Sequence, residues 1–274
     1  MTQALLGPRR LRELLAEHDV VPRKELGQNF VIDPNTITKM VDISGVGATD
    51  HVVEIGAGAG SLTLALANRA ARVTAIEFDR ALIPVLTTVV GGLDNVEVVR
   101  ADALRFDLAS VQATALTGNL PYNIAATIVL RALETAPSLS CLTVMTQREV
   151  GERFAAGPGS KDYGATSVLV RYFGDAEVAS KVSRRSFYPV PNVDSVIVRM
   201  VRAAASPSVD YDDFRMVVKS AFSQRRKMLR NTLVPVTDTA AAAEEALRRA
   251  GIAVTARAEE LGFDDFVALA TELA

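Results

Sequence analysis

The sequence predicts an α/β fold with a mainly parallel sheet, followed by a small helical domain. Three observations support this prediction. Short β-branched runs alternate with helical patterns through the first two thirds of the chain, which is typical of βαβ units. The length of 274 residues exceeds the usual size of one domain. Beyond residue 206 the apolar residues recur only at helical spacing. We therefore expect domains at residues 1–205 and 206–274.

The expected strands are six segments rich in β-branched residues, at residues 51–55, 72–76, 96–99, 113–117, 142–145 and 195–201. A helix is expected at residues 62–67, directly after a run of glycines. Residues 11–18 form an amphipathic stretch to which the sequence assigns no role. In the second domain, helices are expected at residues 214–222, 240–250 and 263–273.

Composition excludes several classes of protein. The single cysteine, Cys141, rules out an intramolecular disulfide and fits a reducing compartment. With two histidines and one cysteine, the chain has no zinc-ligand spacing and little material for a Ser-His-Asp triad. No signal-peptide core and no apolar run of about 20 residues is present. We expect a soluble cytoplasmic protein with no metal and no membrane partner.

A glycine turn at residues 56–60 lies between an expected strand and an expected helix. Glycines at this position let the backbone approach a ligand that a Cβ atom would exclude. Glu77 follows the second strand and is placed to accept hydrogen bonds from ribose hydroxyls, while Asp102 follows the third and is placed near an adenine amino group. A dinucleotide fingerprint fits less well, because Ser61 occupies the place of its third glycine. An ordinary tight turn is the remaining alternative.

The tetrapeptide Asn119-Leu120-Pro121-Tyr122 follows the fourth expected strand, at the same edge of the sheet. An aromatic amine is a poor nucleophile because its lone pair is delocalised into the ring. Two acceptors that take hydrogen bonds from its N–H groups favour the pyramidal form, in which the lone pair is free to attack. The Asn119 side chain supplies one acceptor, and Pro121 favours an extended Leu120 whose carbonyl supplies a second. Tyr122 offers a ring for base stacking, worth about 1–3 kcal/mol. Together the two motifs predict methyl transfer from S-adenosyl-L-methionine to an amino group of a nucleic-acid base.

The chain resembles the ribosomal RNA adenine N6-dimethyltransferases, in particular the branch that acts on small-subunit 16S RNA. The resemblance extends from Val21 to Leu233. It includes six segments: LGQNFVID at 26–33, VEIGAG at 53–58, NLPYNI at 119–124, QREV at 147–150, FYPVPNVDS at 187–195 and FSQRRK at 222–227. The family usually has proline at Ala57, a Ser/Thr pair at Ala125-Ala126 and lysine at Asn192, so a phosphate contact is in doubt at the last position.

This resemblance implies a Rossmann-like class I S-adenosylmethionine-dependent methyltransferase sheet with a small α-helical C-terminal domain. It also implies dimethylation of two adjacent adenosines in a hairpin near the 3′ end of 16S rRNA, by a monomer acting on the immature small ribosomal subunit. The implied cofactor-binding residues are Asn29, Val31, Gly56, Gly58, Glu77, Asp102 and Asn119. Phe187 is expected to be a second stacking face opposite Tyr122, with a plain core position as the alternative.

Basic residues of the second domain are the candidate RNA contacts, although the net charge of the whole chain is -2. They are Arg225, Arg226, Lys227 and Arg230, and they would hold phosphates without reading bases. A solvated helix face is the alternative interpretation. Three other functions remain open: a 23S rRNA methyltransferase of the antibiotic-resistance type, a ribosome-assembly factor that acts mainly by binding, and a nicotinamide oxidoreductase.

Overall fold

The computed structural model describes residues 5–224 and 226–274 and contains two compact units. The first unit comprises the described residues up to Gly151 together with Glu177–Arg202. The second comprises Glu152–Ala176 and Ala203–Ala274. Residues 152–176 thus make their contacts with the second unit, although the sequence prediction starts the helical domain at residue 206. The division into functional domains stays a prediction.

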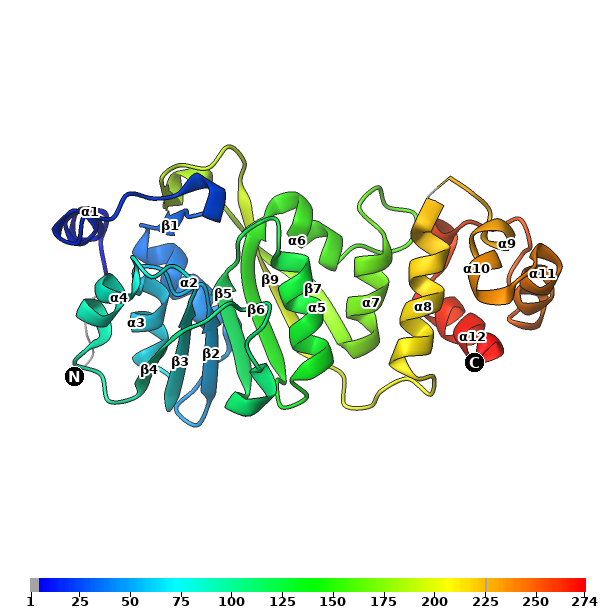
Figure 1. Ribbon diagram of the computed structural model, residues 1–274, viewed down its shortest axis with the longest axis horizontal. Helices are drawn as coiled ribbons and strands as arrows, with labels where there is room; N and C mark the ends of the chain where they lie inside the picture. Colours follow the sequence, from blue (N-terminus) through cyan, green and yellow to red (C-terminus); the bar gives the residue numbers. More distant parts are fainter. Residues whose placement is uncertain (1–4, 225) are drawn as a thin grey trace. The chain divides into compact units, whose positions relative to one another are not determined.

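A seven-stranded sheet forms the centre of the first unit (Figure 1). Its order is β4-β3-β2-β5-β6-β9-β7. The first five strands in this order are parallel, and β9 is antiparallel to β6. The bounds are β2 His51–Ile55, β3 Arg72–Glu77, β4 Val96–Arg100, β5 Ala115–Asn119, β6 Cys141–Gln147, β7 Gly174–Val182 and β9 Ser195–Arg202. The predicted α/β fold with a mainly parallel sheet is confirmed.

The six predicted strands are all present, with small differences at their ends. The strand β5 begins at Ala115 and ends at Asn119, two residues later than predicted, so Asn119 is the last residue of a strand. Two features had no clear apolar signal in the sequence. The edge strand β7 alternates exposed residues, among them Asp175, Glu177 and Lys181, with buried or partly buried ones. The pair β1 (Phe30–Val31) and β8 (Phe187–Tyr188) is only two residues long on each side.

Helices and short 3-10 turns connect the strands of the first unit. They are α1 Pro8–Glu17, η1 Lys24–Leu26, α2 Pro34–Ser44, α3 Ser61–Ala67, α4 Ile83–Val90, η2 Leu108–Val111, α5 Ala125–Thr135, α6 Arg148–Phe154, which continues into the second unit, and η3 Arg184–Ser186. The sequence explains the ends of α2 well. The Asp33 carboxylate accepts from the Asn35 N–H, Pro34 occupies the first turn, and Gly45 ends the helix with φ of 68°.

The main hydrophobic core of the first unit lies where α2 and α3 pack on the sheet. It combines Ile37 and Met40 of α2 with Leu66 of α3 and inward residues of the strands, such as Val52 and Ile197. All five side chains are 2% exposed or less. This rigid packing holds the carboxyl ends of the parallel strands in fixed positions, which is the edge where ligands bind in open α/β sheets.

The second unit is helical. Its elements are α7 Ala165–Phe173, α8 Tyr211–Ala221, η4 Phe222–Gln224, α9 Leu229–Thr232, α10 Val234–Thr237, α11 Ala240–Arg249, η5 Ala258–Glu260 and α12 Phe263–Leu273. Two buried tyrosines fix its loops, because Tyr163 donates to the Leu261 carbonyl and Tyr172 donates to that of Val209. Among the described residues, no helix has the length and apolar character needed to span a membrane.

Candidate active site

The glycine turn after β2 has the backbone conformation that its sequence predicts. Gly56, Gly58 and Gly60 have φ of 74°, 58° and 86°, in the left-handed region that favours glycine. The N–H groups of Gly56 and Ala57 donate to the Ile76 carbonyl, at 2.9 and 3.1 Å, which joins the turn to β3. The family's usual proline is therefore not required here, because the Ala57 N–H makes a hydrogen bond that proline lacks.

Glu77, the last residue of β3, is held by two backbone N–H groups. Its carboxylate accepts from Gly58 at 2.7 Å and from Asp79 at 2.8 Å. The side chain is only 7% exposed. Burial raises the pKa of the Glu77 carboxyl, while the N–H groups of Asp79 and Gly58 stabilise its charged form. The arrangement fixes both carboxylate oxygens and leaves their remaining lone pairs as acceptors for ligand hydroxyls.

Glu54 of β2 is a second buried carboxyl beside the same turn. It is 1% exposed, and its Oε2 atom has no hydrogen-bond partner within the protein. Burial raises the pKa of Glu54 to about 8, and the charge of Glu77 acts in the same direction. Glu54 is therefore mainly protonated at neutral pH. The sequence does not indicate this protonation state.

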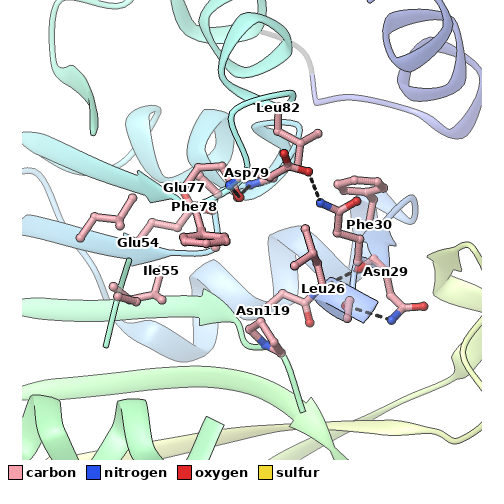
Figure 2. A pocket seen from close by; sticks show the side chains of 18 of the residues that line it. Leu26, Asn29, Phe30, Glu54, Ile55, Glu77, Phe78, Asp79, Leu82 and Asn119 are labelled. Atoms are coloured by element: carbon pink, nitrogen blue, oxygen red, sulfur yellow. Dashed lines mark hydrogen bonds between the residues drawn. The ribbon is translucent and has the colours of Figure 1, made fainter. Parts of the chain in front are cut away.

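A cavity of about 260 Å³ lies at the carboxyl ends of β2, β3, β4 and β5 (Figure 2). It brings together eight of the residues that the sequence singled out: Asn29, Val31, Gly56, Gly58, Glu77, Asp102, Asn119 and Pro121. Asp102 is half-buried, and its Oδ1 atom accepts from the Leu104 N–H at 2.9 Å. Its other oxygen lies 3.7 Å from Arg105. Four successive strands thus contribute to one site.

The ring of Phe78 forms a further wall of this cavity, which none of the sequence motifs indicated. Phe78 follows Glu77 directly, lines the cavity and is 59% exposed, an unusual exposure for a phenylalanine. Figure 2 shows its ring beside Glu77. An exposed aromatic ring next to a ribose-type acceptor is suited to stacking on a flat heterocycle. The available signal was its position, since residues that end parallel strands meet at the ligand-binding edge.

Asn119 ends β5 and points its amide in a defined direction. Its Nδ2 atom donates to the Asn29 carbonyl at 2.8 Å. An amide oxygen cannot take that place, because two oxygens would then face each other. The contact therefore assigns the orientation of the amide, and Oδ1 is the acceptor that Asn119 offers elsewhere. Asn29 is itself held by a bond from its Nδ2 to the Gly27 carbonyl at 3.1 Å.

Three other predicted catalytic residues do not line the cavity. Leu120 is 1% exposed, and its N–H donates to the Met145 carbonyl. The Tyr122 hydroxyl is buried beside Ser195, and burial raises its pKa. Phe187 is fully buried in the core next to Val31, its partner in the β1–β8 pair. The structure therefore places Phe187 at a plain core position, which was the alternative to a stacking face. Its stacking role stays a prediction.

The basic residues of the second unit divide into two kinds. Arg226 and Lys227 are exposed. Arg230 instead forms an ion pair with Glu244 of α11, with a distance of 3.0 Å between Nη1 and Oε1. Arg225 lies outside the described residues. Two of the four predicted phosphate contacts are therefore in exposed positions, while Arg230 also has an intramolecular partner.

Comparison with known proteins gives a consistent result. The family model described as ribosomal RNA adenine dimethylase matches residues 21–274. The ribosomal RNA small subunit methyltransferase A of Leifsonia xyli is 46% identical, with 97% of this chain and 98% of the relative covered. The protein of the same name from Thermobifida fusca is 45% identical, with 97% and 95% covered.

Solved structures also share the fold. A dimethyladenosine transferase from Plasmodium falciparum superimposes with a TM-score of 0.77 at 25% identity, covering 86% of this chain and 94% of the other. The 23S rRNA methyltransferase ErmE has a TM-score of 0.69 at 30% identity, covering 89% and 99%. The chain therefore combines the glycine turn, the fixed Glu77 carboxylate and the oriented Asn119 amide with relatives that match it over nearly their whole length. This chain belongs to the ribosomal RNA adenine dimethylase family.

Proposed function

We propose that the protein transfers methyl groups from S-adenosyl-L-methionine to N6 of two adjacent adenosines in the hairpin near the 3′ end of 16S rRNA. The observation that carries the proposal is one cavity bounded by the Glu77 carboxylate and the oriented Asn119 amide. Relatives at 45–46% identity named for the small ribosomal subunit support this choice of RNA. We place the activity in the cytoplasm, where small subunits mature.

The residues around the cavity fit S-adenosyl-L-methionine. Gly56 and Gly58 line the cavity with left-handed backbone, and a Cβ on Gly58 would lie 3.3 Å from the Phe30 ring. Glu77 is the acceptor for ribose hydroxyls, and Phe78 is a stacking face for adenine. When bound, the cofactor supplies an electrophilic methyl group. Asn29, Val31 and Asp102 complete the proposed cofactor-binding set.

The NLPY loop is the proposed acceptor side. Asn119 Oδ1 accepts one N–H of the adenine amine, and the Leu120 carbonyl accepts the other, which directs the nitrogen lone pair toward the methyl group. Pro121 lines the cavity and favours an extended conformation at Leu120. Tyr122 contributes a stacking face for the base. A strong base is not required, because the methylated amine is far more acidic and loses its proton to water.

The same fold serves a second candidate function, methylation of 23S rRNA. The similarity to ErmE at 30% identity favours it, and the higher identity to the small-subunit enzymes opposes it. A role in ribosome assembly through binding alone is compatible with the same RNA contacts. A nicotinamide oxidoreductase is disfavoured by the glycine spacing at Ser61 and by the NLPY loop.

The decisive experiment offers radiolabelled S-adenosyl-L-methionine with unmodified small subunits, naked 16S RNA and naked 23S RNA in parallel. Dimethyladenosine mapped to the 3′-end hairpin of small subunits is the expected result. Label confined to 23S RNA would contradict the proposal and support the resistance-type activity. Binding to immature subunits without any methylation would leave only the assembly role.

Charge reversal at Arg226 and Lys227 tests the proposed RNA contacts. Each phosphate contact that is lost lowers the slope of log affinity against log salt by about 0.7–0.9. We expect the double reversal to weaken RNA binding and to reduce this slope by roughly 1.5. Arg230→Ala is the matched control with a smaller effect, because Arg230 is already paired with Glu244. Filter binding at several salt concentrations measures both, and an unchanged slope would assign these residues a structural role.

A further inference from the structure

Asp79 is a buried carboxylate that the proposed reaction does not use. Its side chain is 6% exposed, so its charge requires compensating hydrogen bonds. Oδ2 accepts from Gln28 Nε2 at 2.7 Å, and Oδ1 accepts from the Ala81 N–H at 3.0 Å. The backbone N–H of Asp79 donates to Glu77 at 2.8 Å. Asp79 therefore joins the cofactor side of the cavity to the segment that contains Gln28.

Gln28 is held at both ends of its amide. Its Oε1 atom accepts from the Arg23 N–H at 2.8 Å, while Nε2 donates to Asp79. Reversing the amide would place two donors together at one end and two acceptors at the other, so this orientation is the one that satisfies all four groups. The side chain of Gln28 consequently fixes the backbone at residues 28 and 29 relative to β3.

Gln28 and Asp79 together form an anchor, and the next residue, Asn29, connects this anchor to Asn119. Its carbonyl accepts from Asn119 Nδ2, the contact that directs Asn119 Oδ1. We propose that Asp79 and Gln28 are positioning residues, which hold the Asn29 carbonyl in place and thereby keep the Asn119 amide in its productive orientation. Figure 2 shows Asp79, Asn29 and Asn119 around the same pocket. The inference rests on the proposed function for the role of Asn119.

The physical consequence is a loss of alignment when the anchor is broken. A misplacement of about 1 Å in a reacting geometry costs up to roughly 100-fold in rate. Among the proposed cofactor-binding residues, Glu77 and the glycine turn keep their own hydrogen bonds to each other, whereas Asn29 moves with the Gln28–Asp79 pair. We therefore expect the turnover number to fall much more than the affinity for the cofactor.

A reciprocal exchange tests this pair. Gln28→Glu places two carboxylates against each other, and Asp79→Asn places two amide donors against each other while retaining an oxygen for the Ala81 N–H. We expect each single variant to lose roughly tenfold to 100-fold in kcat, with a smaller change in cofactor Kd, because Asn29 also belongs to the proposed cofactor-binding set. The double variant, Gln28→Glu with Asp79→Asn, restores one donor facing one acceptor and recovers most of the kcat.

Two readouts are independent of activity. Calorimetric titration with S-adenosyl-L-methionine measures cofactor Kd. The side-chain amide resonance of Asn119, identified by its loss in Asn119→Ala, reports the hydrogen bond to Asn29 in the absence of cofactor. We expect it to shift in both single variants and to return in the double variant. An unmoved resonance in the single variants, or a double variant no better than the worse single one, would overturn the inference.

The wild-type protein separates this inference from the proposed function. If wild type methylates small subunits and Gln28→Glu has wild-type kcat, the positioning role is wrong and the proposed function stands. If wild type methylates no RNA, the proposed function fails, and the amide resonance still decides whether the anchor orients Asn119. A fall in melting temperature and cofactor affinity that matches the fall in kcat would overturn the positioning role as well.

Discussion

The cofactor side of the cavity, which would hold the methyl donor and is called the donor side below, is already formed: Gly58, the Glu77 carboxylate and the Phe78 ring surround an open volume. On the acceptor side, Leu120 and Phe187 are packed away from that volume. Asn119 and Pro121 of the NLPY loop line the cavity, whereas Leu120 and Tyr122 do not. The difference matches the two proposed ligands: a small cofactor binds a preformed surface, whereas the base arrives as part of a large RNA. The two sides should therefore respond differently to substitution.

Asn119→Ala is expected to give the largest effect, because it removes the amide whose orientation is fixed by the Asn29 carbonyl. Loss of a single oriented group that stabilises a transition state costs about 10²–10³-fold in kcat. Cofactor affinity should remain largely intact, since the hydrogen bonds from Gly58 and Asp79 that hold Glu77 do not involve Asn119. Single-turnover methyl transfer and cofactor titration measure the two quantities. Turnover like that of wild type would refute the proposed chemistry.

Asn119→Asp is the matched control for that substitution. It keeps an acceptor but puts an oxygen against the Asn29 carbonyl in place of the amide donor. Its activity is expected to lie between those of wild type and Asn119→Ala. Equal activity of the aspartate variant and wild type would show that the orientation of the amide is unimportant.

Glu77→Ala is expected to have the opposite profile, with its main effect on the donor side. The substitution removes the ribose acceptor and leaves the Gly58 and Asp79 N–H groups without their partner. Hydrogen bonds to a charged group contribute about 1.5–3 kcal/mol, so cofactor Kd should rise roughly tenfold to 100-fold. Glu77→Gln, which retains one oxygen, should lose less. RNA affinity should not change, and a change there would break the separation between the two sides.

Glu54 allows the donor side to be tested through pH. Its folded-state pKa of about 8 lies above the ordinary value of 4.5, so the folded protein binds more protons between these limits. The resulting stabilisation is fully present below pH 4.5 and is lost as pH rises through 8. Wild type should lose up to about 1.4 kcal/mol of unfolding free energy per pH unit relative to Glu54→Gln. Urea denaturation between pH 5 and 8.5 measures this difference, and parallel curves would refute the protonated state.

Sequence patterns predicted the donor side better than the acceptor side, for a physical reason. The glycine turn and Glu77 depend on local backbone conformation and on strand ends, both of which leave a signature in short segments. Burial of Phe187 depends on the β1–β8 pair and on α2, which are distant in sequence and too short or too varied to be identified. The anchor formed by Gln28 and Asp79 likewise joins residues 51 positions apart. No local sequence pattern predicts such a contact.

Tyr122→Phe should have the smallest effect and sharpens the comparison on the acceptor side. The substitution keeps the ring that would stack on the base and removes only a hydroxyl, which is buried beside Ser195. The hydroxyl has no hydrogen-bond partner among the described residues, so kcat should fall by less than about fivefold, the equivalent of one ordinary hydrogen bond of about 1 kcal/mol. Tyr122→Ala removes the ring, and stacking worth about 1–3 kcal/mol predicts a clearly larger loss. Equal activity of the two variants would show that the ring stays packed during catalysis, and the acceptor side would then rely on Asn119 and the Leu120 carbonyl alone.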